Sequence, residues 1–173
     1  MKTSQLLKSM KVVSWIIFIG ICIKAGAILI SFLISLFIDP EVAKDLYMGL
    51  DLLSVQHFSH TYYVAFVVLM LFLLVVQAFI FFWVIKLFAK FNEQTPFSLL
   101  LSDLISKISY ATLIAGGLAL IGTALSKWLV KQGIAVNYDW SAQEFLFMGA
   151  VVFIFGLFYK RGIEIQSENE LTI

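Results

Sequence analysis

The chain has little charge, one cysteine and few prolines, and these shortages exclude several classes of protein. The chain has 173 residues, among which Cys22 is the single cysteine and two are prolines. Charged residues make up 13% of the chain. A single cysteine excludes an internal disulfide and any redox or zinc site built on cysteine pairs. The formal net charge of +1 leaves no basic surface of the kind that binds nucleic acid. We therefore expect no direct contact with nucleic acid.

Apolar residues are abundant instead. Hydrophobic residues make up 61% of the chain, against about 45–50% in an average soluble domain, and the mean hydropathy is +0.98. A soluble domain of this length could not bury so much apolar surface and keep a polar exterior. The composition therefore predicts a membrane protein, with the lipid bilayer as its main partner.

Four apolar runs are long enough to cross a bilayer, whose ~30 Å core needs about 20 helical residues. Backbone groups in lipid must bond to one another, and unbroken apolar runs favour helices over alternating barrel strands. The sequence therefore predicts an all-α, polytopic, single-domain protein with four transmembrane helices in an antiparallel bundle. The predicted spans cover residues 12–38, 62–85, 108–126 and 143–159.

Lysine and arginine indicate the orientation of these spans. Eight of the twelve basic residues flank the two chain ends and the second loop, three lie on the other side, and Lys24 lies inside the first span. Because basic residues concentrate in cytoplasmic loops, both termini are expected in the cytoplasm, with the spans in the inner membrane. Residues 160–173 then form a cytoplasmic tail. Residues 40–57 read as an amphipathic segment that starts at Pro40 and lies on the outer membrane surface.

Lys24 is the strongest single indication of a site. A charge near the middle of the membrane costs ~2.5–3.5 kcal/mol on insertion scales and usually faces a bundle interior or a cavity. Since no acid lies deep in another span, Gln77 is the best partner for Lys24. The alternative is a structural lysine that is hydrogen-bonded in the bundle or reaches the interface. The predicted ligand or ion site consists of Lys24, Ser31, Gln77, Thr112 and Thr123.

The two histidines, His57 and His60, are weak candidates for a metal site. Their spacing could place both on one helix face. Zinc, however, needs three or four ligands, and the alternative is a polar cap before the second span. The chain contains no HExxH, GxSxG or glycine-rich phosphate motif. We therefore expect no catalytic residue and no cofactor, and we do not expect an enzyme.

Two segments on the predicted cytoplasmic side could contact a protein partner. In the inner loop, Thr95 reads as a helix N-cap and Pro96 as the first helical residue. The tail mixes acidic and apolar residues, which suits a binding handle. Alternatively, the tail packs back on Pro96 and Phe97 and stabilises this end of the protein. The predicted partner-binding residues are Pro96, Phe97, Glu164, Glu168, Asn169 and Leu171.

These two segments also carry a family resemblance. Residues 94–97 are similar to an inner-loop pattern G-x-P-F, without its glycine, and residues 162–173 match G-x-x-L-x-x-E-N-x-L-T-[VI] except for Ile165. Together with the four spans, they resemble the bacterial family known as domain of unknown function 2975, over nearly the whole chain. Many members are encoded beside a small helix-turn-helix regulator. The resemblance therefore implies a small inner-membrane protein that works with a small cytoplasmic DNA-binding regulator.

Three functions remain open at the level of sequence. The first is a non-enzymatic membrane sensor or interaction protein. The second is a small transporter, channel or lipophilic-ligand carrier with its site at Lys24, for which a homo-oligomer would be needed to form a pore. The third is an immunity protein that shields the membrane from a toxin, or a membrane-stress protein.

Overall fold

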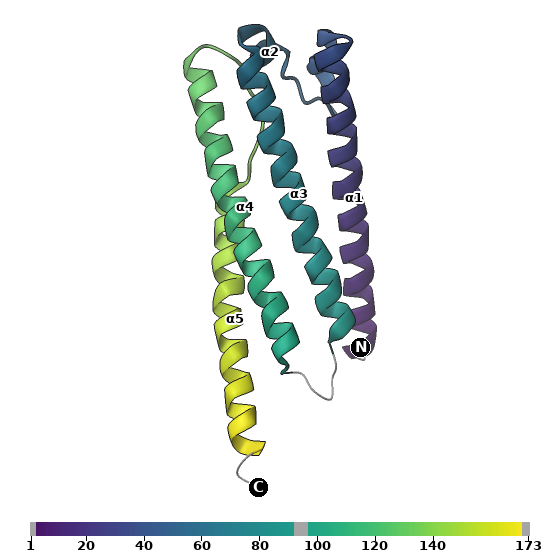
Figure 1. Cartoon of the computed structure of the whole chain (residues 1–173), viewed down its shortest axis with the longest axis vertical. Helices are drawn as coiled ribbons and strands as arrows, with labels where there is room; N and C mark the ends of the chain where they lie inside the picture. The colour runs from purple at the N-terminus through teal and green to yellow at the C-terminus, as the bar shows by residue number, and fades with distance from the viewer. Residues whose placement is uncertain (1–2, 92–96, 171–173) are drawn as a thin grey trace.

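The computed structural model describes residues 3–91 and 97–170, with side chains for residues 5–91 and 97–168. Over these residues the chain is helical and has no strand, as the sequence predicts (Figure 1). Four helices are long and apolar enough to cross a membrane. They are α1 (Thr3–Phe37), α3 (His60–Lys90), α4 (Leu99–Lys131) and α5 (Ala142–Glu170).

The long helices run up and down in chain order, and each packs against its neighbours in the sequence (Figure 1). Helix α3 contacts α1 on one side and α4 on the other, and α4 also contacts α5. Over the described residues, α1 makes no extensive contact with α4 or α5, so α1 and α5 form the two edges. Helix α1 begins and α5 ends at the same end of the molecule, which we call the termini end. The opposite end is the loop end.

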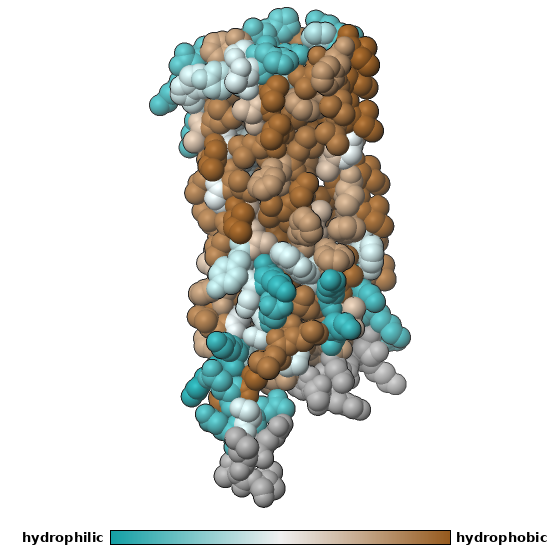
Figure 2. Space-filling model, in the orientation of Figure 1, coloured by the Kyte–Doolittle hydropathy of each residue, from teal (hydrophilic) through white to brown (hydrophobic). Residues whose placement is uncertain are grey.

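A band of apolar residues lies between the two polar ends of the molecule. Figure 2 shows hydrophilic residues gathered at the loop end and at the termini end, with hydrophobic residues covering the surface between them. This is the distribution expected of a protein whose middle contacts lipid and whose ends contact water.

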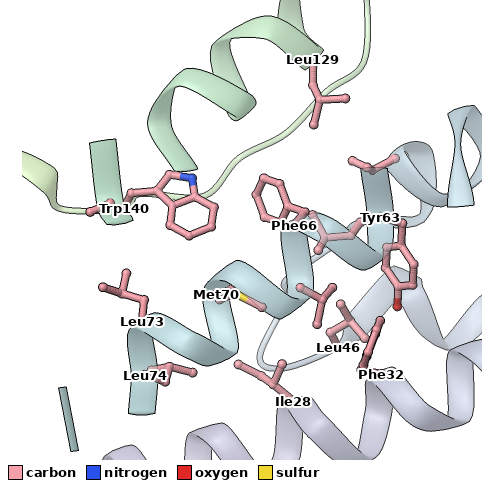
Figure 3. Close-up of a cluster of buried hydrophobic side chains, with 14 of the residues drawn as sticks. Ile28, Phe32, Leu46, Tyr63, Phe66, Met70, Leu73, Leu74, Leu129 and Trp140 are labelled. Carbon is pink, nitrogen blue, oxygen red and sulfur yellow. The ribbon is translucent and has the colours of Figure 1, made fainter. Parts of the chain in front are cut away.

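The hydrophobic core lies toward the loop end, where two short helices fill the space beside α1 and α3 (Figure 3). These are the 3-10 helix η1 (Pro40–Asp45), which Asp39 caps, and α2 (Leu53–Phe58). Leu46, between them, packs in the same cluster as Phe32 of α1 and Tyr63 of α3. Residues 43, 46, 52 and 55 are almost completely buried.

The amphipathic segment predicted over residues 40–57 is therefore not one continuous helix, and much of its apolar face is buried in the protein. The segment is interrupted at Met48 and Gly49, whose φ angles are positive (46° and 87°), so it cannot continue as one helix. Its apolar side chains also contact α1 and α3 rather than a lipid surface. An apolar stripe indicates that a face is buried, but not whether lipid or protein covers it.

Hydrogen bonds tie the loop-end elements together. The hydroxyl groups of Ser35 on α1 and Tyr63 on α3 bond to each other, and Ser35 also donates to the carbonyl of Phe32. The side-chain amide of Gln56 on α2 donates to the Ser35 carbonyl at 3.3 Å. Such bonds between helices satisfy polar groups that would otherwise lie unpaired in an apolar environment.

Helix α4 begins later than the sequence suggests. Its N-cap is Ser98, which has an extended backbone and accepts a hydrogen bond from the N–H of Leu101 at 3.4 Å. The predicted cap Thr95 and first residue Pro96 lie outside the described residues. Serine is among the preferred N-cap residues, and here it is the cap nearest to the apolar run.

Helices α4 and α5 pack closely because glycines lie at their contacts. A Cβ atom at Gly116 would lie 2.7 Å from a side-chain atom of Leu146, and one at Gly149 would lie 2.7 Å from Leu113. The Ser109 hydroxyl donates to the Gly149 carbonyl across the same contact at 3.2 Å. Small residues let neighbouring membrane helices approach in this way.

Helix α5 is shifted along α4 toward the termini end. Trp140, just before α5, packs on Gly122, nine residues before the end of α4, which corresponds to about 14 Å of helix. Residues 134–141 therefore run back along α4 as non-helical chain (Figure 1). At its other end, α5 extends beyond the first residue of α4. The fourth predicted span, residues 143–159, lies within α5, and the non-helical residues 134–141 lie beside α4 at the loop end.

Candidate functional site

Lys24 lies half-buried on α1, and its amine points toward the segment after η1. Its Nζ atom lies 6.0 Å from the centroid of the Tyr47 ring, at the limit of a cation–π contact. Within residues 3–91 and 97–170, no hydrogen bond or ion pair to Lys24 is found. This is the position of a lysine whose stem packs on protein while its amine reaches toward a more polar level.

The other residues of the predicted Lys24 site are not gathered around it. Thr112 and Thr123 belong to α4, which makes no extensive contact with α1. Their hydroxyls donate to backbone carbonyls one turn earlier in α4, at 2.7 and 2.8 Å. Gln77 lies on α3, and the described side chains show no hydrogen bond between it and Lys24. Ser31 shares α1 with Lys24, two turns further along.

Of the cavities lined by described residues, three stand out, and Lys24 lines none of these three. The first, of about 440 Å³, lies between α1 and α3 and has apolar walls that include Cys22. The second, of about 170 Å³, lies between α4 and α5 and is lined by Ser102, Ser106 and Lys160 among others. The third lies at the loop end.

At the termini end, the last part of α5 is fixed to the start of α4. The ring of Phe97 packs against the ring of Tyr159, with centroids 5.3 Å apart. The Tyr159 hydroxyl accepts a hydrogen bond from the N–H of Ser98 at 3.1 Å. A Cβ atom at Gly162 would lie 2.6 Å from Cε1 of Phe97, so this ring needs a glycine opposite it. One residue of the predicted tail, Gly162, therefore lies against Phe97, and Pro96 lies outside the described residues.

Beyond this junction, the end of α5 presents charged and apolar side chains to solvent. Arg161 and Glu164 form an exposed ion pair at 2.7 Å, one turn apart. Ile165 and Glu168 are also exposed. Of the predicted partner-binding residues, Glu164 and Glu168 therefore lie on an accessible helix surface, whereas the Asn169 side chain and Leu171 lie outside the described part of the chain.

The two histidines are both exposed, His57 near the end of α2 and His60 at the start of α3. No group of three or more metal-binding side chains occurs in the described regions. The described geometry therefore does not support the two histidines as metal ligands.

The sequence predictions miss a cleft at the loop end, between α4 and residues 134–141. The side chain of Trp140 is 2% exposed, and its indole N–H donates a hydrogen bond to the Ser126 hydroxyl at 2.8 Å. Its ring packs edge-on against the ring of Phe66 on α3, with centroids 5.0 Å apart (Figure 3). This anchor holds the non-helical chain beside α4 and leaves a cavity of about 490 Å³. Two signals in the sequence pointed to it: the shortness of the fourth apolar run and the small residue Gly122 in the third. The lining includes Thr123, Ser126, Lys127, Lys131, Tyr138, Asp139 and Trp140.

The comparison with protein families gives one match. The family model described as a protein of unknown function (DUF2975) matches residues 53–173. The chain belongs to this family. The DUF2975 match runs from α2 to the end of the chain, so it includes both the junction at Phe97 and the loop-end cleft.

The DUF2975 match also limits what the family implies. It leaves out the first 52 residues, which contain α1 and Lys24, so it covers less than the nearly complete chain that the sequence motifs suggest. No curated protein and no solved structure matches this chain.

Proposed function

We propose that this DUF2975 protein is a non-enzymatic membrane interaction protein that holds a cytoplasmic partner with the exposed end of α5. One observation carries the proposal. Helix α5 is fixed to the start of α4 through Phe97, Tyr159 and Gly162, and then continues past α4 as a helix on which Glu164, Ile165 and Glu168 are exposed. A helix that is anchored at one end and exposed at the other is pre-organised for binding, which reduces the entropic cost of association.

The charge of this helix end suggests the kind of partner. Glu164, Glu168 and Glu170 outnumber the basic Arg161 over residues 161–170. An acidic helix is the electrostatic complement of the basic surface with which DNA-binding proteins contact phosphates. A small helix-turn-helix regulator, which the family resemblance implies, therefore suits this surface. The excess of basic residues flanking the termini end supports its placement in the cytoplasm, where such a regulator would be.

A charge reversal tests the partner surface. Glu164→Lys changes the acidic helix end, and Glu41→Lys makes the same change at an exposed residue of η1 at the loop end. Each full-length variant would be purified from detergent extracts of its bacterial host, and the co-purified proteins identified by mass spectrometry. We expect a small DNA-binding protein to be lost from Glu164→Lys and retained by Glu41→Lys and by the wild type.

Deletion of residues 162–173 provides the stronger version of this test. The deletion removes Gly162, and hence the contact with Phe97, so its folding must be checked by size-exclusion chromatography. A list of co-purified proteins that is the same for the wild type, the deletion and Glu164→Lys would refute the proposed partner surface.

A further inference from the structure

The loop-end cleft lies where non-helical chain meets the membrane. Its α4 wall includes Thr123 and Ser126, which belong to the apolar run of residues 108–126, and Lys127 and Lys131, which lie just beyond that run. Non-helical backbone at membrane depth is tolerated only where protein covers it or where it lines a water-filled cavity. In many membrane transporters, chain of this kind marks a binding site. The cleft thus has the setting of a site.

The charges in the cleft favour an anion. Lys127 and Lys131 are one helical turn apart and both line the cavity. In the part of the chain that the structure describes, neither forms an ion pair with an acidic side chain. Asp139 also lines the cavity, but its carboxylate accepts a hydrogen bond from the N–H of Ser141 at 2.9 Å rather than pairing with either lysine. The described lining therefore carries one net positive charge.

The rest of the lining is apolar or aromatic. Val130, Val136, Tyr138 and Trp140 form walls beside the two lysines. The Ser126 hydroxyl oxygen accepts the Trp140 N–H, so its own hydrogen is directed elsewhere. The two lysines lie toward the loop end of the cleft, and Trp140 forms a deeper aromatic wall at the level of Gly122, beside the hydroxyl groups of Thr123 and Ser126. That arrangement matches a molecule with a charged head and an apolar chain.

We propose that this cleft binds an anionic amphiphile, with its phosphate or carboxylate head at Lys127 and Lys131 and its apolar chain against the ring of Trp140. The source of such a molecule is either the headgroup of an anionic membrane lipid or a free amphiphile. The site goes beyond the proposed function and does not depend on it, although residues 134–141 lead directly into α5, whose far end is the proposed partner surface.

The test uses the full-length protein in nanodiscs of phosphatidylcholine, which carries no net charge. In one arm, dodecyl phosphate is titrated and thermal unfolding is followed, with dodecanol as the uncharged control. In the other arm, part of the phosphatidylcholine is replaced by phosphatidylglycerol. A ligand that binds only the folded protein raises Tm in a concentration-dependent way, from which its affinity follows.

The variants are Lys127→Gln and Lys131→Gln, with Lys127→Arg to preserve the charge. Lys44→Gln is the matched control, because Lys44 is an exposed lysine at the same end that does not line the cleft. We expect each glutamine variant to weaken binding about tenfold, because each loses one charge-assisted contact. Lys127→Arg and Lys44→Gln should bind like the wild type.

The two arms identify the source. Stabilisation of the wild type by phosphatidylglycerol that is reduced in Lys127→Gln assigns the site to a lipid headgroup. Stabilisation by dodecyl phosphate alone, with the same dependence on Lys127, assigns it to a free amphiphile. Absence of stabilisation in both arms, or equal responses in all variants, would overturn the site. If Glu164→Lys loses its partner but binds the anion unchanged, the result supports the proposed partner surface and leaves the loop-end site unaffected.

Discussion

Trp140 determines how the loop end is arranged. Its ring fills the space above Gly122, its N–H is satisfied by Ser126, and its edge contacts Phe66 of the neighbouring helix. A buried tryptophan usually needs such a partner for its N–H group. These three contacts hold the non-helical residues 134–141 against α4, beside Thr123 and Ser126 of its apolar run.

The contact between Trp140 and Gly122 leaves no room for a side chain. A Cβ atom at Gly122 would lie 2.2 Å from the Trp140 ring, whereas one at Gly117 would meet no atom within 4 Å. We expect Gly122→Ala to displace the ring and lower the free energy of unfolding by about 1–3 kcal/mol. Gly117→Ala, on the same helix, should be neutral or stabilising by up to about 1 kcal/mol. Thermal unfolding in detergent measures both, and equal Tm values would contradict the importance of this contact.

Lys24 is the strongest site candidate in the sequence, but its surroundings in the structure do not form a recognisable site. Its depth makes it conspicuous, but it lines none of these three cavities, and among the described side chains its amine lies near the Tyr47 ring. We therefore expect Lys24→Met to fold, to be at least as stable as the wild type, and to gain up to ~2.5–3.5 kcal/mol from the removed charge.

Lys44→Met is the matched control, because Lys44 is already exposed at the loop end and its loss should change Tm little. Thermal unfolding and partner capture measure the effect of Lys24→Met. A variant that remains folded but loses partner capture would return Lys24 to the role of a functional site.

At the scale of the elements, the sequence predicts which segments are helices but not how they are offset. The four apolar runs identify α1, α3, α4 and α5, because backbone groups in lipid leave few alternatives to a helix. The shift of α5 along α4 depends on contacts between residues far apart in sequence, such as Trp140 with Gly122, Leu146 with Gly116 and Leu113 with Gly149. Hydrophobic periodicity identifies a helix face, but it does not specify how far two antiparallel helices slide past each other.

The candidate sites also divide into features that the sequence predicts and features that depend on how the elements are placed. The contact between Gly162 and Phe97 agrees with one of the two alternatives left open by the sequence, which places both segments at the same end of the spans. The surroundings of Lys24 could not be predicted, because they depend on where η1 places Tyr47. The loop-end cleft combines residues of α4 with residues 134–141, and neither segment alone contains a recognisable binding motif.

For the molecule as a whole, the open question is where lipid ends and water begins. The helices pack in chain order with α1 and α5 at the edges, so most of the middle surface is apolar and suited to lipid. The loop-end cleft interrupts this pattern, because it carries polar side chains into the apolar run of α4. If water enters the cleft, a residue of α4 that lines the cleft contacts water. Its neighbour in the sequence, at nearly the same depth but outside the cleft, contacts lipid.

Two neighbouring positions test this difference. Thr123 lines the cleft, whereas Ala124 is exposed but does not line it, and the two differ in depth by only about 1.5 Å of helix. In a Cys22→Ser background, we expect Thr123→Cys to react with a membrane-impermeant maleimide applied to whole cells from which the outer membrane has been removed. Ala124→Cys should react far more slowly, because a thiol in lipid does not ionise readily. Equal protection of both positions would mean that the cleft is closed to water, and labelling only after the inner membrane is permeabilised would reverse the predicted orientation.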